Sequence, residues 1–500
     1  MKTKKITALL CTLTLALSAV TSAFAAESNT DWGQFLGSPV AAGITTAKIP
    51  TSPDIAAESW SEKYTITSEY NGAKFENNAC GTPITIGDFL YFTVADGRLL
   101  KLDAKTGKVA ASAAVSGIPA YFSQIASGDG KIYVPQQTAS GVTVSAFSTD
   151  TLAAVWTSDV VSSGDSAQQI ASPITYYDHH IYFGTYTQDM TTYAFTSGVY
   201  ASVDTNTGHI AWQQANTAAG YYWNGGAVLG SAIAVADTSG NLSTYNLTTG
   251  EKGSTVSVGG PVSSTVTYAN GRIYASVKSG TVYSVQADAS GIIAETTAKK
   301  SAVLGNNITS SPVVYNGRLY VAGGGYGAKT PFSVLNASTL ETVYQISGIH
   351  SQSSPLVTTA YAKEQNGTVY IYVASYGTAN QDGTFSKDSS NVYVIEDKPS
   401  QTKASYKTLF TPDIAQSSTQ SLTPSRDGML FYFNDSGTMY AINDSGMMHT
   451  LDDKASGTND TKAPLNSPKT GEFPVASGAV VFILSGAAVV LLRRKAKGDR

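Results

Sequence analysis

The stretch "SSPVVYNGRLYVA", Ser310 to Ala322, decides the fold because close variants of it recur along the chain. They include "GTPITIGDFLYFT" from Gly81, "ASPITYYDHHIYFG" from Ala171 and "GGPVSSTVTYANGRIYAS" from Gly259. Each variant has a turn-forming dipeptide between two runs of apolar residues. Asn-Gly and Asp-Gly between such runs are the strongest short signal of a β-hairpin. The chain is therefore expected to repeat one hairpin many times.

The turn dipeptide keeps its place in five copies of the repeat, and it predicts a type I′ turn with two positive φ angles. These copies are Asp129-Gly130, Asn270-Gly271, Asn316-Gly317, Asn366-Gly367 and Asp427-Gly428. An apolar residue, usually Tyr, follows three positions after the dipeptide, and its neighbours are apolar too. This pattern indicates a strand that is packed on both faces.

Two more turns follow in most copies, so each unit is predicted to contain four antiparallel strands. The units have a mean period of about 48 residues, which is typical of propeller blades. Eight units are expected to begin near Pro83, Ser123, Pro173, Gly226, Pro261, Pro312, Pro355 and Leu422. The fold class predicted is all-β, an eight-bladed β-propeller, with a seven-bladed ring as the alternative.

The last unit lacks a fourth strand, since it ends at "MYAIND" near Met439. The segment "ESWSEKYTI" around Trp60 resembles the missing strand. We therefore expect an N-terminal strand to close the ring beside the last blade, which would remove exposed sheet edges.

Composition and charge exclude several classes of protein. The chain has 500 residues, a formal net charge of −4 and 14% charged residues. That balance does not suit a nucleic-acid surface, and the apolar content is too high for disorder. The counts of 29 Tyr and 46 Gly favour strands joined by tight turns.

The N-terminus has the three parts of a secretory signal peptide, expected to span residues 1–26. Lysines at positions 2, 4 and 5 precede an apolar run, and Ala23-Phe24-Ala25 forms a small-residue cleavage site. Removing the signal leaves Cys80 as the single cysteine, so no intramolecular disulfide is expected. The propeller is predicted to occupy residues 27–443.

The C-terminus carries a second targeting pattern. A polar spacer, residues 444–466, precedes "SPKTG" and then an apolar segment, residues 473–492, long enough to span a bilayer. The basic tail "RRKAKGDR" follows and would stay in the cytoplasm. This order resembles the cell-wall sorting signal of Gram-positive surface proteins, where a sortase cuts between Thr and Gly and joins the Thr to peptidoglycan.

The five residues that a sortase would recognise are Ser467, Pro468, Lys469, Thr470 and Gly471. Ser467 departs from the Leu of the usual Leu-Pro-x-Thr-Gly pattern. The resemblance implies a secreted protein anchored to the cell wall, tethered to the membrane through residues 473–492 before processing. The alternative is a single-pass membrane protein with an extracellular propeller.

The repeat itself resembles that of PQQ-like, or quinoprotein-like, β-propellers. The phrases "SSPVVYNGRLYVA" and "VDTNTGHIAW" carry the resemblance, as does the opening "DWGQFLGSP" from Asp31. That family includes quinone-dependent alcohol and sugar dehydrogenases, and also scaffold propellers that bind no cofactor. The alcohol-dehydrogenase branch implies a vicinal Cys pair and Ca²⁺ held by carboxylate and amide oxygens. Cys80 has no such partner, so no catalytic, cofactor or metal residue is assigned.

The segment "GYYWNGG" is the candidate ligand platform, because it lies outside the repeat and just before an inner strand. Aromatic side chains at a propeller mouth suit the binding of sugars or peptides, but large rings also fill gaps between blades. The platform residues are Tyr221, Tyr222, Trp223 and Asn224.

The inner strands begin with hydroxyl and amide side chains, which we expect to rim the axial funnel. They either bind a polar ligand or solvate the channel. The residues concerned are Ser310, Ser311, Gln352, Ser353, Ser354, Ser417, Ser418, Thr419 and Gln420.

The leading hypothesis is therefore a surface-anchored, non-catalytic propeller that serves as a platform for an envelope or extracellular protein or glycan. A PQQ-dependent oxidoreductase, holding PQQ with Ca²⁺, is the runner-up, and an adhesin is the third hypothesis. Sortase and peptidoglycan are expected partners, and nucleic acid is not.

Overall fold

The computed structural model describes residues 31–70, 73–78, 80–115, 118–119, 124–164, 168–325, 327–380 and 384–446. The predicted signal peptide and sorting signal, the apolar segment 473–492 and nearly all of the spacer lie outside these residues. Among the helices in the described ranges, none combines the length and apolar character needed to cross a membrane.

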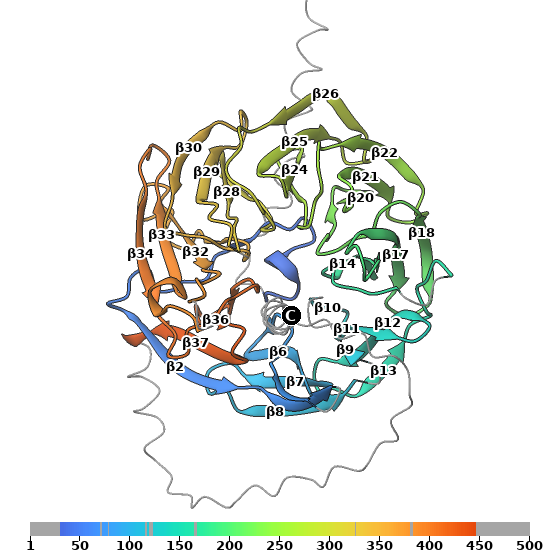
Figure 1. The fold of residues 1–500 in the computed structure, drawn as a ribbon, viewed down its shortest axis with the longest axis horizontal. Coiled ribbons are helices and arrows are strands. Elements are labelled where there is room, and N and C mark those ends of the chain that lie inside the picture. The colour runs from blue at the N-terminus through green and yellow to red at the C-terminus, as the bar shows by residue number, and fades with distance from the viewer. Residues whose placement is uncertain are drawn as a thin grey trace, which may run out of the picture. The chain divides into compact units, whose positions relative to one another are not determined.

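Eight β-sheets form a ring in the described part of the chain, and each contains a run of four antiparallel strands (Figure 1). The sheets follow one another around the ring in sequence order. The eight-bladed prediction is confirmed, and the seven-bladed alternative is wrong. We number the blades from the one that begins with β5.

In blades 1 to 4 the chain runs from the inner to the outer strand, in the following order. Blade 1 contains β5 (Ile84–Ile86), β6 (Phe89–Val94), β7 (Arg98–Asp103) and β8 (Val109–Ala114). Blade 2 contains β10 (Ala126–Gly128), β11 (Lys131–Thr138), β12 (Gly141–Ser148) and β13 (Ala154–Thr157), with β9 (Ile118–Pro119) beside β11. Blade 3 contains β14 (Thr175–Tyr177), β15 (His180–Gly184), β17 (Phe195–Asp204) and β18 (Ile210–Asn216), with β16 (Thr187–Gln188) beside β17. Blade 4 contains β19 (Ala227–Val228), β20 (Ala232–Ala236), β21 (Asn241–Asn246) and β22 (Lys252–Ser257).

Blades 5 to 7 have the same plan, and blade 8 receives its outer strand from the N-terminus. Blade 5 contains β23 (Thr267–Ala269), β24 (Arg272–Val277), β25 (Thr281–Ala287) and β26 (Ile293–Lys300). Blade 6 contains β27 (Val313–Tyr315), β28 (Arg318–Val321), β29 (Phe332–Asn336) and β30 (Thr342–Ile346). Blade 7 contains β31 (Leu356–Thr358), β32 (Val369–Ala374), β33 (Val392–Asp397) and β34 (Ser405–Phe410), with β1 (Ile44–Thr45) parallel to β31. Blade 8 contains β35 (Thr423–Pro424), β36 (Leu430–Phe433), β37 (Thr438–Asp444) and β2 (Ala56–Lys63).

Strand β2 closes the ring, as the sequence predicts. It pairs with β37 in antiparallel register from Ala56 opposite Asp444 to Lys63 opposite Thr438. A separate hairpin follows it, formed by β3 (Ile66–Tyr70) and β4 (Ala73–Asn77). Because the first and last parts of the propeller share one sheet, β37 is paired on both sides and the ring is closed at blade 8.

The predicted type I′ turn is present where both residues of the dipeptide have positive φ and the two flanking strands pair directly up to it, as at Asp129-Gly130, Asn270-Gly271 and Asn316-Gly317. Asn316 and Gly317, with φ of 45° and 76°, connect two strands paired from Tyr315 to Arg318. Two predictions of this turn are wrong. Asn366-Gly367 ends a longer loop between β31 and β32, in which Gly367 N donates to the carbonyl of Ala362. Asp427 lacks the positive φ, and Gly428 N donates to the carbonyl of Ser425 instead.

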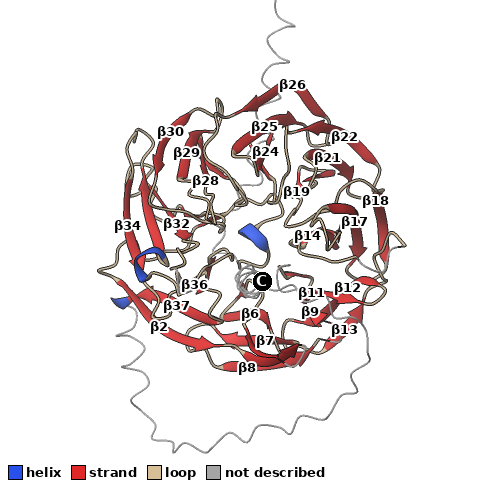
Figure 2. Ribbon diagram, viewed as in Figure 1, coloured by secondary structure: helices blue, strands red, loops and turns tan. Residues whose placement is uncertain are grey.

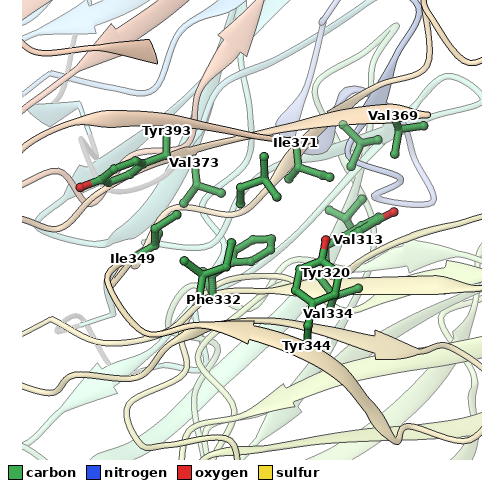
Figure 3. Close-up of a cluster of buried hydrophobic side chains, with 14 of the residues drawn as sticks. Val313, Tyr320, Phe332, Val334, Tyr344, Ile349, Val369, Ile371, Val373 and Tyr393 are labelled. Atoms are coloured by element: carbon green, nitrogen blue, oxygen red, sulfur yellow. The ribbon is translucent and has the colours of Figure 1, made fainter. Parts of the chain in front are cut away.

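Apolar side chains fill the space between neighbouring blades. Between blades 6 and 7, Val313, Phe332 and Val334 face Ile371 and Val373 across the gap (Figure 3). This explains why the strands are apolar on both faces, since each sheet is covered by two neighbours.

The opening phrase also provides hydrogen bonds inside and between blades. Ser310 Oγ donates to the carbonyl of Ala322 in its own blade, at 2.7 Å. Ser311 Oγ accepts from Thr265 N of blade 5, at 3.0 Å. The carbonyl of Pro312 accepts from the hydroxyl of Thr267 in blade 5, at 2.5 Å. The repeated Ser-Ser-Pro sequence is therefore first a joint between blades.

Candidate functional site: the axial pocket

The N-terminal segment crosses the centre of the ring and bonds to the inner strands of several blades. The carbonyl of Gly33 accepts from Ser127 N of blade 2, and the carbonyl of Pro39 accepts from Val228 N of blade 4. The carbonyl of Gly43 accepts from Val357 N of blade 7. The short helix η1 (Phe35–Gly37) lies near the centre, coloured blue in Figure 2. A second short helix, η2 (Lys387–Ser389), lies in a loop of blade 7.

A pocket lies on the axis beside this segment, and all eight blades contribute to its wall. Apart from Phe35, which belongs to the N-terminal segment, its lining residues lie just before the inner strands. The lining comprises Phe35, Thr82, Gln124, Ala171, Pro173, Trp223, Ser264, Thr309, Ser311, Gln352, Ser354, Thr419, Gln420 and Ser421. No charged side chain is among these lining residues.

The pocket is small. The volume open to water-sized groups is about 60 Å³, which holds roughly four to six of them at about 10–15 Å³ each. Counted together with the open mouth, the hollow reaches about 530 Å³. A second hollow of about 10 Å³ on the same axis, lined by Trp32, Gln34 and Phe35 among others, has room for about one water.

Hydrogen bonds between adjacent blades fix the polar wall. Ser354 Oγ accepts from Ser311 N at 2.9 Å, and Ser421 Oγ accepts from Ser354 N at 3.0 Å. Thr265 Oγ1 accepts in the same way from Gly225 N, at 3.2 Å. Together with the bond from Thr265 to Ser311, these contacts connect blades 4 to 8 around the axis.

Three lining side chains have buried polar atoms without a hydrogen-bond partner among the described residues. Both amide atoms of Gln352, the hydroxyl of Thr309 and Oε1 of Gln420 are in this state. Gln352 is only 5% exposed and Thr309 is 7% exposed. A buried polar group without a partner costs about 1–3 kcal/mol. The wall of the pocket therefore contains both donors and acceptors that lack a partner among the described residues.

Trp223 contributes the aromatic part of the wall, in a backbone conformation unusual for a bulky residue. Its φ is 62°, in the left-handed region that large side chains rarely adopt. Asn224 Nδ2 donates to the carbonyl of Val262 at 3.1 Å, which holds the next residue against blade 5. The Trp223 ring stacks on Tyr222 at 4.7 Å between centroids, and Tyr222 stacks on Phe195 at 5.0 Å. Such local strain is typical of functional sites.

The structure divides the predicted platform. Tyr221 is buried between blades 3 and 4, where its ring lies 5.3 Å from that of Tyr200 and its hydroxyl 3.4 Å from that of Tyr245. Asn224 is buried as well, while Tyr222 and Trp223 are half-buried. Of the four residues, Trp223 lines the pocket and Tyr222 supports it from behind.

The predicted polar rim is divided in the same manner. Ser311, Gln352, Ser354, Thr419 and Gln420 line the pocket. Others bond to the backbone instead, since Ser310 Oγ donates to Ala322 and Ser418 Oγ donates to Phe433.

The sequence pattern did not single out the other eight lining residues, which are Phe35, Thr82, Gln124, Ala171, Pro173, Ser264, Thr309 and Ser421. Seven of them precede an inner strand by two to four residues, so the repeat alignment itself was a usable signal. Phe35 had no such signal, because its segment lies outside the repeat.

Cys80 and the acidic side chains do not form a reactive centre. Cys80 is buried in the apolar cluster between blades 8 and 1, and burial raises the pKa of its thiol. The described residues contain no group of three or more His, Cys, Asp or Glu side chains placed to hold a metal ion. The sortase pentapeptide lies outside the described residues.

Pyrroloquinoline quinone, the cofactor that the fold suggests, does not fit this pocket. It is a fused three-ring tricarboxylate, whereas the lining offers no cation to balance those charges and no carboxylate for Ca²⁺. We therefore derive no redox step from this site.

The ring of eight four-stranded blades defines the class as a quinoprotein-like β-propeller. Residues 57–221 and 196–500 match the family described as "Outer membrane protein assembly factor BamB", and the chain belongs to that family. A comparison with curated protein sequences finds no match.

Solved structures with the same fold include a scaffold protein and enzymes. BamB from Moraxella catarrhalis has 12% identity and a TM-score of 0.53, covering 78% of this chain and 100% of its own. A europium-containing methanol dehydrogenase has 10% identity and a TM-score of 0.59, and the match covers 83% of this chain and 98% of the dehydrogenase. Quinohemoprotein alcohol dehydrogenase from Comamonas testosteroni has 11% identity and a TM-score of 0.58, and the match covers 90% of this chain and 84% of that enzyme. At these identities the likeness concerns the fold alone.

Proposed function

We propose that the protein is a non-catalytic binding propeller that recognises an envelope or extracellular protein or glycan at its axial pocket. The observation that carries the proposal is the uncharged pocket wall, in which Trp223 stands among buried amide and hydroxyl groups without partners. Such a site can select a neutral polar group, but it has no acid, base or nucleophile in a charged state to perform chemistry.

We also propose that the propeller is displayed on the cell wall through the sorting signal. The support is the order of pentapeptide, apolar segment and basic tail in the sequence. In the variant Thr470→Ala, we expect no chain to be linked to the cell wall and the whole chain to stay in the membrane fraction. Cell-wall linkage of this variant at the wild-type level would contradict the proposal.

The binding proposal is tested with the full chain in detergent and with isolated envelope fragments. We expect the wild-type chain to sediment with fragments of its own envelope, and the double variant Trp223→Ala, Gln352→Ala to stay in solution. Tyr406→Ala is the matched control, because Tyr406 is an exposed aromatic residue on the outer strand β34. Equal sedimentation of the double variant would overturn the pocket as the binding site.

The oxidoreductase hypothesis is tested on the same sample by thermal unfolding with pyrroloquinoline quinone and Ca²⁺. A ligand at 100 times its Kd stabilises the folded state by about 2.7 kcal/mol. We expect no change in Tm, and a saturable rise would overturn the non-catalytic proposal.

A further inference from the structure

We propose that the axial pocket binds one uncharged sugar residue, with its hydroxyl-bearing edge in the pocket and an apolar face against Trp223. This inference rests on the proposed binding function and names the chemical class of the ligand. The probe that represents it is a single neutral pyranose, free or at the end of a glycan.

The unpartnered groups select a ligand that both donates and accepts hydrogen bonds. In Gln352 the amide donor and the amide oxygen are both buried without a partner, and in Gln420 only the oxygen is, since its Nε2 donates to the carbonyl of Cys80. A hydroxyl group can satisfy both kinds of partner. A carboxylate can only accept, so it would leave the amide oxygens of Gln352 and Gln420 without a donor. An ammonium can only donate, so it would leave the amide nitrogen of Gln352 without an acceptor. Neighbouring hydroxyls on one sugar ring therefore match this set, and ionised ligands do not.

The aromatic wall gives the site its second requirement. The Trp223 ring has an extended apolar face suited to the C–H groups of a pyranose. Its position is fixed by the stack on Tyr222 and by the Asn224 bond to Val262. Because these contacts exist within the protein itself, little conformational freedom remains to be lost when a ligand binds.

Pocket size limits the ligand to one residue. The volume of about 60 Å³ has room for roughly four to six water-sized groups. That is enough for one edge of a pyranose with two or three hydroxyls, while the rest of the ring lies in the open mouth. A longer glycan would extend outward along the axis.

The test uses tryptophan fluorescence of the full chain in detergent, titrated with glucose, galactose, mannose and N-acetylglucosamine. Glucuronate and glucosamine are the charged counterparts. We expect a saturable change with at least one neutral sugar, and binding weaker by about tenfold or more for its charged counterpart. Trp223→Phe should remove the fluorescence change, and Tyr406→Ala should leave it unaltered.

Two variants of Gln352 separate recognition from folding. Gln352→Ala removes both polar atoms, and Gln352→Glu keeps the shape but cannot donate when ionised. Each variant should lower the affinity for the neutral sugar by roughly tenfold or more. The near-ultraviolet circular dichroism spectrum should stay that of the wild type. If Gln352→Ala disrupts the fold, Gln352→Glu alone decides.

The outcomes distinguish this inference from the function on which it rests. If no neutral sugar binds but envelope sedimentation still depends on Trp223, the sugar inference fails and the binding function stands. Equal affinity for neutral and charged sugars would also overturn the inference. If sedimentation is independent of Trp223 and Gln352, the proposed function itself fails.

Discussion

Asp435 shows how a single carboxyl group makes stability depend on pH. It lies between β36 and β37, where Ser417 Oγ donates to its Oδ2 and its own N donates to the carbonyl of Ser417. Burial raises the pKa of Asp435 from 3.8 to about 6, although the bond from Ser417 opposes this shift. A pKa that is higher in the folded state means that folding favours the protonated form. The stabilisation is therefore complete below about pH 4 and is lost as the pH rises through about 6.

We predict that the wild type loses up to about 3 kcal/mol of unfolding free energy relative to Asp435→Asn between pH 4 and 7, at about 1.4 kcal/mol per pKa unit. The amide keeps the shape of the acid and does not ionise. Urea unfolding of both chains at several pH values measures the difference. Parallel profiles for the two chains would contradict the assignment.

Asp397 provides a second residue-scale prediction, because two tyrosines and an arginine depend on it. Its carboxylate accepts from Tyr320 and Tyr344, each at 2.8 Å, and Arg318 Nε lies 3.9 Å away. Asp397→Ala should cost about 3–5 kcal/mol, since two buried hydroxyls lose their acceptor and the buried Arg318, which keeps three bonds to carbonyls, loses its counter-charge. Tyr344→Phe removes one bond and should cost about 1–2 kcal/mol. Denaturant unfolding measures the free energy of unfolding of both variants. Equal losses in the two variants would contradict the proposed role of Asp397 as the shared acceptor.

The repeat pattern includes Tyr320, in the stretch from Ser310 to Ala322, but it gives no indication of the partner of this tyrosine. Asp397 lies 77 positions beyond Tyr320 and belongs to the next blade. Pairing across blades depends on how the sheets rotate around the axis, which the pattern of one strand does not contain. The same reason explains why the unpartnered state of Gln352 could not be predicted.

At the scale of the element, tryptophans of outer strands dock on glycine turns of the next blade. Trp60, Trp156 and Trp212 donate through Nε1 to the carbonyls of Ala104, Thr205 and Leu247, at 2.8 to 3.0 Å. Their rings lie against Gly107, Gly208 and Gly250. This contact links blade 8 to 1, blade 2 to 3 and blade 3 to 4. Between blades 6 and 7 the Tyr344 bond to Asp397 takes its place.

A pair of glycine variants isolates the energy of this docking contact. Gly250 and Gly130 both have a φ of 69°, but a Cβ at Gly250 would lie 2.5 Å from the Trp212 ring, whereas none of the atoms near Gly130 is within 4 Å. Gly130→Ala should therefore cost about 1 kcal/mol, from the left-handed backbone alone. Gly250→Ala should cost at least about 2 kcal/mol more, because the ring must move. Thermal unfolding of the two variants gives the comparison, and equal Tm values would mean that Trp212 contributes little.

The turn predictions show what a dipeptide can and cannot determine. Asn316-Gly317 forms the expected turn because the strands on both sides pair right up to it. Asn366-Gly367 has the same letters, yet residues 359–368 form a longer loop there. Asn-Gly favours positive φ, but the length of a loop depends on where strand pairing stops.

At the scale of the whole molecule, the ring should depend on the N-terminal strand. A chain lacking residues 31–63 loses β2, Trp60 and the axial segment together. We predict that it loses the single cooperative unfolding transition of the closed ring. Replacing residues 66–77 by a Gly-Ser linker is the control, since β3 and β4 pair only with each other. Calorimetry measures the unfolding transition of both variants. A single cooperative transition in the chain lacking residues 31–63 would contradict closure of the ring by β2.

Blade number, blade order and ring closure could be predicted because they follow from a repeated pattern. The contribution of Phe35 to the axial pocket could not be predicted. Residues 31–50 have no period, and several of their carbonyls bond to the blades, as at Pro39 and Val40, which accept from Val228 N and Tyr268 N. Backbone contacts of this kind do not depend on the choice of side chain.

The place of β37 determines how the propeller responds to mechanical force. This strand is bonded on one side to β36 and on the other to β2, both antiparallel, and the described chain ends two residues after it. A pull on the chain beyond residue 446, directed along β37, loads the bonds to both neighbours in shear, so that they resist together rather than opening one by one. The pocket lies on the axis, away from this seam. Tension on a tether would therefore be borne at the rim while the shape of the binding site is preserved.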